Sequence, residues 1–529
     1  MSAQRSIKED VKRGEEDLIF DGMKIAKERI AEAKRNRSDQ LDLANLGLSE
    51  LPEELFKLTD LNGLNLSFNQ LADLPPEIGQ LTNLQMLRVT DNRLKTLSGE
   101  IGKLRSLWHL SVNNNRLTTL PMELRNLDRL DTLNLRSNKF VTLPEPITKL
   151  SSLSSLNISG NRLKTIPLSV TSMENLDYID ISQNQLTELP KSICMLNGLT
   201  YLYASDNQIK SIPPEIGNLG SLARLFLDNN LIESLPKEIA SCGNGVLDLH
   251  LSGNRFREFP LEALGSGISI LNLSDNQISQ LPELFDREER PDSFFLANNY
   301  ISEIPQSWSH IKFQGLNFRK NRFNQFPKVL LTMDSLFLLD LSGNQITEIP
   351  SEIDKLKNLK ILGLESNQIK ELPSSFSKLT QLEFLFISDN HLQSFPKRLK
   401  NLNKLTVIQA VGNPIRSIDP ELIAGENILY MEIDPLFLES PNPLEMKVVA
   451  TQSLIPDHFK HDILCTESAY FTSFDLVKKS NEERILTSQD INLIRRIQAD
   501  VGDSQRVRKV DPLGVVTLPM LRKYYKDLQ

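Results

Sequence analysis

One asparagine recurs along most of this chain at a nearly constant interval. The interval is 23 residues over the first half of the series and stays close to that value afterwards. A fixed period of this length indicates that each repeat is one supersecondary unit that stacks on its neighbours. The sixteen positions are Asn69, Asn92, Asn115, Asn138, Asn161, Asn184, Asn207, Asn230, Asn254, Asn276, Asn299, Asn321, Asn344, Asn367, Asn390 and Asn413.

The residues around each asparagine follow one pattern, L-x-x-L-x-L-x-x-N-x-L-x-x-L-P-x-x-I-x-x-L-x-x. The L-x-L segment alternates with period two, which predicts a short strand whose leucines point inward. Strands of neighbouring units are expected to pair in parallel, about 4.8 Å apart. The L-P-x-x-I segment predicts a short helical or 3₁₀ turn on the return path. With a degenerate unit before Asn69 and another near Met431, about eighteen coils are expected over residues 41–437.

The stretch SLWHLSVNNNRLTTLP, residues 106–121, holds three consecutive asparagines. Asn115 occupies the repeated position, where the chain leaves the strand and turns. Its amide can donate to a buried carbonyl and accept from a backbone N–H, so it satisfies polar groups that a buried turn would otherwise leave without partners. Asn115 is therefore expected to be structural, and Asn113 and Asn114 are expected to lie at the surface.

This pattern is that of the leucine-rich repeat. The 23-residue unit with Leu-Pro-x-x-Ile resembles the intracellular Ras-group class, which includes the Sur-eight/Soc-two scaffold, Scribble and Erbin. The resemblance covers about three quarters of the chain. It implies an α/β solenoid, a curved arch with parallel strands on the concave face, and a protein-binding role. It also implies a small GTPase or a phosphatase catalytic subunit as partner. The nearest match to a phosphatase docking peptide is Ile311-Lys312-Phe313, inside a repeat.

The coils near residues 231–321 depart from the regular spacing, with intervals of 24, 22, 23 and 22 residues. Pro291 and Phe313 occupy positions that usually hold leucine, and several glycines lie in the return paths. Two interpretations are open. The coils vary within a tolerant outer loop, or they form a local bend that divides the arch into two binding segments.

Two regions lie outside the repeats. Residues 1–40 include a charged helix, GMKIAKERIAEAKRNRSD, with Met23, Ala26, Ile30 and Ala33 on one face. We expect this helix to cap the first coil, and a flexible docking arm is the alternative. Residues 438–529 do not repeat and are expected to be a small, partly helical extension or a separate interaction module. They contain thirteen basic and thirteen acidic residues.

Composition and motifs argue against several function classes. Sixty basic residues against 68 acidic ones give a net charge of −8, unlike a nucleic-acid-binding protein. The charged first residues do not predict a secretory signal, no apolar run is long enough to span a membrane, and three cysteines favour a reducing, cytoplasmic location. No catalytic motif, metal site or cofactor site is expected. His458 and His461 are more consistent with a solvated turn than with metal ligands.

The side chains between the inward leucines form the expected binding surface. Aromatic residues and arginine at these alternating positions are not needed for the core, and such residues are enriched at binding hot spots. The candidate contact residues are Trp108, His109, Tyr178, Asp180, Tyr201, Tyr203, Arg224, Phe226 and Asp228, followed by a second set, Phe295, Phe337, Phe384 and Phe386. Some of the later phenylalanines could instead pack against one another or under the C-terminal tail.

The sequence thus favours a non-enzymatic intracellular signalling scaffold. Three alternatives stay open at this point: an enzyme whose site lies in residues 438–529, a component of a cytoskeletal, ciliary or membrane-proximal assembly, and a pathogen effector with leucine-rich repeats.

Overall fold

A computed structural model describes residues 21–243, 247–264, 268–283, 291–309, 311–416, 418, 422 and 430–433. The described residues fall into two compact units. The first comprises residues 21–254 with 262–268, and the second comprises residues 255–261 with 269–433. The predicted extension 438–529 and the first half of the 1–40 segment lie outside the described residues.

Each coil contributes one short parallel strand. The strands of the first unit are β1 (Gln40–Asp42), β2 (Gly63–Asn65), β3 (Met86–Arg88), β4 (His109–Ser111), β5 (Thr132–Asn134), β6 (Ser155–Asn157), β7 (Tyr178–Asp180), β8 (Tyr201–Tyr203), β9 (Arg224–Phe226) and β10 (Leu247–His250). Those that follow are β11 (Ile268–Asn272), β12 (Ser293–Phe295), β13 (Gly315–Asn317), β14 (Leu338–Asp340), β15 (Ile361–Gly363), β16 (Phe384–Phe386), β17 (Val407–Ala410) and β18 (Tyr430–Ile433).

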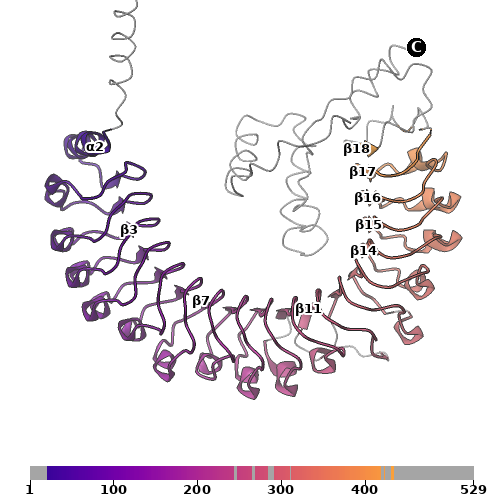
Figure 1. Ribbon diagram of the computed structural model, residues 1–529, viewed down its shortest axis with the longest axis horizontal. Helices are drawn as coiled ribbons and strands as arrows, with labels where there is room; N and C mark the ends of the chain where they lie inside the picture. The colour runs from indigo at the N-terminus through magenta and orange to yellow at the C-terminus, as the bar shows by residue number, and fades with distance from the viewer. Residues whose placement is uncertain are drawn as a thin grey trace, which may run out of the picture. The chain divides into compact units, whose positions relative to one another are not determined.

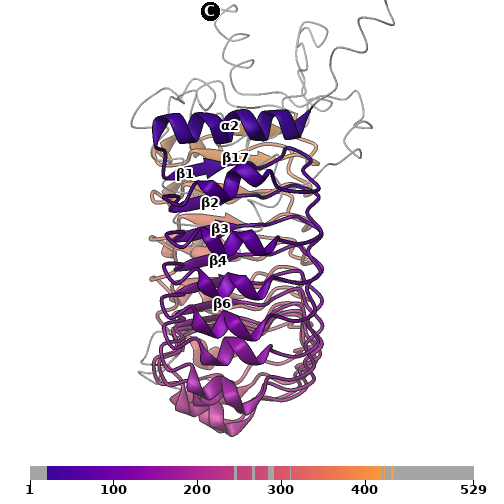
Figure 2. The same ribbon diagram turned by 90° about the vertical axis from the view of Figure 1, so that its left-hand side faces the viewer.

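Among the described residues, most coils return through a short 3₁₀ helix on the side away from the strands (Figures 1 and 2). Most of these helices follow a proline, which presets φ for such a turn; η3 instead follows Ser98, whose side chain accepts the Glu100 N–H. The 3₁₀ helices are η1 (Glu53–Lys57), η2 (Pro76–Gln80), η3 (Gly99–Lys103), η4 (Met122–Asn126), η5 (Glu145–Lys149), η6 (Leu168–Ser172), η7 (Ile193–Met195), η8 (Pro214–Asn218), η9 (Lys237–Ser241), η10 (Leu261–Leu264), η11 (Gln306–Trp308), η12 (Lys328–Thr332), η13 (Ser351–Lys355), η14 (Ser374–Lys378) and η15 (Leu399–Asn401).

The strands pair in the register that the repeat predicts. Leu64 lies opposite Leu87, which lies opposite Leu110, and the leucine, isoleucine and valine side chains of the coils form one buried core in each unit. The predicted fold class, a leucine-rich repeat solenoid with parallel strands along one side, is confirmed.

All sixteen repeated asparagines are buried, and each bonds to backbone in its own coil and in the preceding one. Asn115 shows the arrangement. Its Nδ2 donates to the carbonyls of Val89 at 2.8 Å and Val112 at 3.0 Å, and its Oδ1 accepts the N–H of Leu94 at 3.0 Å. In each of these coils, the asparagine side chain thus bonds the turn to the preceding coil.

The residue before each of these asparagines has a positive φ, as Asn114 does at 55°. This left-handed conformation favours glycine and asparagine, which explains why small or polar residues precede most repeated asparagines. The expectation for Asn113 and Asn114 is thereby refined. Asn114 is exposed and makes the turn, whereas Asn113 is half-buried and accepts hydrogen bonds from Thr90 and Ser111 at 2.7 Å.

An α-helix, α2 (Gly22–Asn36), lies over the first coil and packs against β1 and η1 (Figure 2). Ala26, Ile30 and Ala33 are buried beneath it, while Met23 is half-buried. The helix approaches the coil so closely at Gly22 that a Cβ there would lie 1.6 Å from the Leu46 carbonyl oxygen. The exposed residues of the helix are mostly polar, so the helix covers the end of the leucine core with a polar surface.

The irregular coils keep the asparagine bonds and replace leucine with proline or phenylalanine at two positions. Ile232 still donates to Asn254, and Phe256 to Asn276, although the coils differ in length. Pro291 and Phe313 are buried in their leucine positions. Phe313 packs with Phe294 and Trp308, with ring centroids 5.1 and 5.2 Å apart. The variation in length is therefore accommodated away from the asparagine turns. The two interpretations of these coils remain predictions.

Candidate protein-binding surface on the strands

Each strand turns one set of side chains into the leucine core and the next set away from it. We call the side of each unit that carries the outward-pointing strand side chains its inner face. Parallel pairing places these side chains in rows, because the same strand position recurs in every coil. In the first unit, one row contains Tyr178, Tyr201, Arg224 and Asp248, and the adjacent row contains Asp180, Tyr203, Phe226 and His250.

Four of these side chains form a continuous stack that we call the aromatic ladder: Tyr178, Tyr203, Phe226 and His250. The ring centroids of Tyr178 and Tyr203 are 5.3 Å apart, those of Tyr203 and Phe226 are 4.7 Å apart, and those of Phe226 and His250 are 4.2 Å apart. The last two pairs are nearly parallel, at 10° and 15°. Tyr178, Tyr203 and Phe226 are half-buried and His250 is buried, so the ladder presents aromatic surface that the leucine core does not use.

An ion pair and a further tyrosine flank the ladder. The Arg224 Nε lies 3.3 Å from an Asp248 carboxylate oxygen, and the Arg224 guanidinium lies 6.0 Å from the centroid of the Tyr201 ring. Tyr201 and Tyr178 are 6.4 Å apart between ring centroids. These half-buried groups keep a cation and an anion beside aromatic rings, an arrangement common where proteins bind one another.

Burial controls the ionisation of the groups in and beside the ladder. It lowers the pKa of His250 to about 4, with a further contribution from the Arg224 charge, so the stacked imidazole is neutral at pH 7. Burial also raises the pKa of Tyr178 to about 12, assisted by the Asp180 charge. It raises the pKa of Asp228 to about 6, although hydrogen bonds from Ser252 and Ser205 oppose this shift.

Asp248 and His250 are functional candidates that the sequence reasoning missed. They occupy the strand positions of Arg224 and Phe226 one coil later, and the alternation in LDLHL contains the signal that would have found them. The 24-residue spacing of this coil obscured the alignment of its positions with those of its neighbours.

Two predicted contact residues also accept hydrogen bonds from the backbone. Asp180 accepts the Ser182 N–H at 2.9 Å, and Asp228 accepts the Ser252 N–H at the same distance. Asp180 also accepts a bond from Asn157 at 3.0 Å. Asp180 therefore stabilises the turn that follows its own strand, and Asp228 bonds the turn of the next coil, in addition to any contact they make with a partner.

Trp108 and His109 form a separate pair. Their rings meet edge to face, with centroids 5.6 Å apart. Trp108 is 41% exposed and directly precedes β4, and His109 is half-buried. Burial and the Arg88 charge lower the pKa of His109, and Asp131 opposes this effect. Strands β5 and β6, with Thr132 and Ser155 in the same row, separate this pair from Tyr178.

The expectation of exposure is wrong for three of the four later phenylalanines, and the alternative, that some pack against one another, holds for Phe384 and Phe386. Phe295, Phe384 and Phe386 are 4%, 3% and 0% exposed. Phe384 and Phe386 stack at 6.5 Å between ring centroids and belong to an apolar cluster against which the partly buried Phe337 packs. The exposed contact surface suggested by sequence is therefore restricted to the first unit.

The described residues contain little that points to chemistry. Cys194 and Cys242 are buried thiols, and burial raises the pKa of each to about 12. No cluster of three metal-ligating side chains occurs among the described residues. In the same part of the chain, no helix has the length and apolar character to cross a membrane. Cys465, His458 and His461 lie outside the described residues, and so does His310.

Comparisons with known proteins agree with the repeat. Three family models match: "Leucine-rich repeat region" at residues 293–423, "Leucine rich repeat" at 82–140 and 151–209, and "Leucine Rich repeats (2 copies)" at 197–240. A solved leucine-rich repeat protein from Leptospira interrogans is 32% identical, with a TM-score of 0.59 over 73% of this chain and 93% of that one.

Two plant receptors are more distant. The peptide hormone receptor RGFR1, solved in complex with RGF2, is 27% identical, with a TM-score of 0.50 over 73% of this chain and 69% of that one. The Arabidopsis receptor kinase HAESA, solved with the peptide hormone IDA and the co-receptor SERK1, is 24% identical, with a TM-score of 0.52 over 74% of each chain. No curated protein sequence matches the chain significantly.

Proposed function

Because the chain belongs to the leucine-rich repeat family, we propose that it is a non-enzymatic scaffold that binds a protein partner through the aromatic ladder. Leucine-rich repeat proteins generally mediate protein–protein interaction, and no enzyme family is indicated by the comparisons. A scaffold is also consistent with a described region that contains buried thiols rather than reactive ones.

The observation that supports this proposal most is the ladder itself. Tyr178, Tyr203 and Phe226 come from three strands, stack on one another, and remain half-exposed on the inner face. An aromatic side chain can bury about 150–250 Å² against a partner and loses little conformational freedom on binding. Here the rings are already held by their neighbours, so the cost of ordering them on binding is reduced.

The flanking charges define the chemistry of the partner. The Arg224–Asp248 pair flanks the ladder, and Asp180 occupies the strand position of Tyr203 one coil earlier. A partner segment with apolar or aromatic side chains would cover the half-exposed rings, and an arginine or lysine would pair with a carboxylate beside them. The proposed partner is therefore a polypeptide surface with an apolar centre and basic groups at its edge.

Within that class, we favour a small GTPase in an intracellular signalling complex, on the resemblance to the Ras-group repeats. The phosphatase alternative is weaker, because Ile311 and Phe313 of the candidate docking peptide are 4% and 0% exposed. The RGFR1 complex shows that a related solenoid binds a peptide hormone. The reduced thiols of Cys194 and Cys242 fit the proposed intracellular location.

Binding of the full chain to purified small GTPases, in both nucleotide states, and to a phosphatase catalytic subunit would test this proposal. The double variant Tyr203→Ser/Phe226→Ser should weaken the interaction more than about tenfold, because two central aromatic contacts are lost. The matched control is Tyr300→Ser, which removes an exposed ring that follows Asn299 at a turn rather than in a strand. It should bind as the wild type does.

Two results would contradict the proposal in different ways. Equal binding by the double variant would exclude the ladder as the contact surface. If the folded wild-type chain bound none of these proteins, the partner class would be wrong.

A further inference from the structure

The inner face of the second unit differs chemically from that of the first. Along β14 to β17 its outward positions hold Leu338, Ile361, Phe384, Phe386 and Val407, and these side chains form one apolar cluster. The sequence shows this as a loss of alternation, since FLLDL and FLFI are nearly continuous apolar runs. Strands with nearly continuous apolar sequences are typically buried on both faces.

The structure buries this face. Ile361 and Phe386 have no exposed surface, and Phe384 has 3%. The leucine core lies on the other side of the sheet from these side chains. Leu362 and Leu385, which point into that core, alternate with them along the strands. Stacking along a row does not by itself bury such a position, since Tyr203 stacks between two neighbours in the first unit and stays half-exposed.

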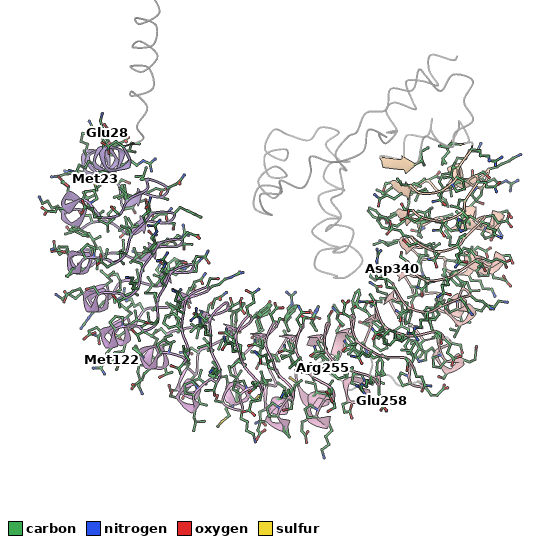
Figure 3. All side chains as sticks on the ribbon, in the orientation of Figure 1. Met23, Glu28, Met122, Arg255, Glu258 and Asp340 are labelled. Carbon is green, nitrogen blue, oxygen red and sulfur yellow. The ribbon has the colours of Figure 1, made fainter. Side chains whose placement is uncertain are left out.

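The buried face also includes polar side chains. Asn317, Asp340 and Gln409 have no exposed surface, and Figure 3 shows Asp340 on the strand side of the second unit. Asn317 and Asp340 accept the backbone N–H groups of Arg319 and Ser342 at 2.9 Å. A face that mixes buried apolar and hydrogen-bonding groups is complementary to polypeptide, which provides both kinds of group, rather than to a lipid chain.

We propose that residues 434–529 of the same chain dock on the inner face of β12 to β17. The tail begins directly after β18, which pairs with β17, so its attachment point lies beside the buried face. Six strands at about 4.8 Å spacing extend over roughly 25 Å, which about eight extended residues can span. Attachment by a short linker gives an effective concentration in the millimolar range, so the tail competes well with any separate partner.

The composition of the tail agrees with this assignment. Residues 444–455 and 491–501, LEMKVVATQSLI and INLIRRIQADV, are segments with aliphatic side chains that a docking site would cover. The equal numbers of basic and acidic residues in 438–529 give the tail no net repulsion from the face. This inference goes beyond the proposed partner binding and does not depend on it. It assigns one inner face to the chain itself and leaves the other face for a partner.

Site-specific photo-cross-linking in the full chain tests the assignment. Phe384 is replaced by p-benzoylphenylalanine, and cross-linked peptides are mapped by mass spectrometry in an equal mixture of ¹⁴N and ¹⁵N chains. We expect cross-links to residues 434–529 within one isotopic chain. The matched control carries the same replacement at Tyr203, and its cross-links to 434–529 should be at least tenfold fewer. If the Phe384 variant does not fold, replacement of the half-buried Phe337 probes the edge of the same cluster.

Four outcomes would overturn the proposal. Cross-links between ¹⁴N and ¹⁵N chains would mean that a second copy covers the face. Cross-links only to repeats of the same chain would mean that neighbouring coils close it. A folded Phe384 variant that gives no cross-link would mean that the tail does not dock on this face. Equal numbers of cross-links to the tail from positions 384 and 203 would mean the same.

Discussion

The inner faces of the two units differ although their repeats do not. Both have the leucine core, the buried asparagines and the positive-φ residue before each asparagine. At the third residue of a three-residue strand, the first unit places Tyr203, which is half-exposed, and the second places Phe386, which is buried. An aromatic residue at one repeat position can thus be half-exposed or fully buried, depending on what covers its sheet.

This difference shows how a repeat separates stability from recognition. Residues that bond or pack between successive coils are needed in every coil, and they recur. The outward strand positions are not needed for that shared packing, so their residues are free to vary. The first unit uses them for Tyr178, Arg224 and their neighbours, and the second uses them for the aliphatic and aromatic cluster around Ile361.

The largest expected effect compares those two aromatic residues directly. Phe386→Ala should lower the free energy of unfolding by about 3–5 kcal/mol, because it leaves a cavity in a buried cluster. Tyr203→Ala should cost less than about 1 kcal/mol, as expected of a partly exposed side chain. Urea unfolding followed by fluorescence and circular dichroism would measure both. Equal losses would show that the two faces are buried to the same degree.

The buried asparagines should behave alike in both units. Asn115→Ala and Asn344→Ala should each lower the free energy of unfolding by ~1–3 kcal/mol, because buried backbone groups lose their partner. Asn344 donates to the Phe318 carbonyl at 3.0 Å and accepts the Phe323 N–H at 3.0 Å, as Asn115 does one unit earlier.

Trp108→Ala serves as the comparison for these two variants, because its side chain is exposed. It should leave thermal melting nearly unchanged. Its role as a contact residue is a separate prediction, which loss of partner binding would support. A larger drop in melting temperature for Trp108→Ala than for Asn115→Ala would reverse the assigned roles.

The largest pH effect is expected in the first unit. The His250 pKa is lowered to about 4, so between pH 6.5 and pH 4 the folded chain binds fewer protons at this site than the unfolded chain. The stabilisation is present above pH 6.5 and is lost as the pH falls through this window, by on the order of 2 kcal/mol. The raised pKa of Asp228, about 6, acts in the opposite direction, favouring the folded state as the pH falls.

His250→Phe separates these two contributions. The variant keeps a ring beside Phe226, but this ring cannot titrate. Asp228 is present in the wild type and in the variant, so its contribution cancels when the two are compared. The difference in melting temperature between wild type and variant should therefore change between pH 7 and pH 4.5, in favour of the variant at the lower pH. A difference that is independent of pH would rule out a neutral, buried imidazole.

The smallest effect concerns the positive-φ position, which both units share. Phe68 and Lys320 adopt φ values of 57° and 52°, where bulky residues are strained. Phe68→Asn and Lys320→Asn should each raise the free energy of unfolding by about 0.5–1 kcal/mol, measured by urea unfolding. Because Asn114 already suits a positive φ, Asn114→Gly should change the free energy of unfolding by less than about 0.5 kcal/mol. Destabilisation by both asparagine variants would mean that the native side chains make contacts that outweigh the strain.

The sequence by itself determined the features that depend only on successive coils. Its period predicts the parallel strands and their register, and the Leu-Pro pairs predict the turns. The interval between asparagines identifies the side chains that bond to buried backbone. It also indicated an outward surface at Tyr201 and Tyr203, because alternation in a strand states which side chains share a face.

Only the tertiary structure decided which outward positions are exposed and which rings meet. Alternation cannot distinguish a covered sheet face from an open one, so Phe295, Phe384 and Phe386 were expected at the surface and are buried. Nor did it reveal that His250 completes the aromatic ladder or that Trp108 lies apart from it. Those properties depend on the neighbouring coils and on whatever covers the sheet, and the pattern of one repeat contains neither.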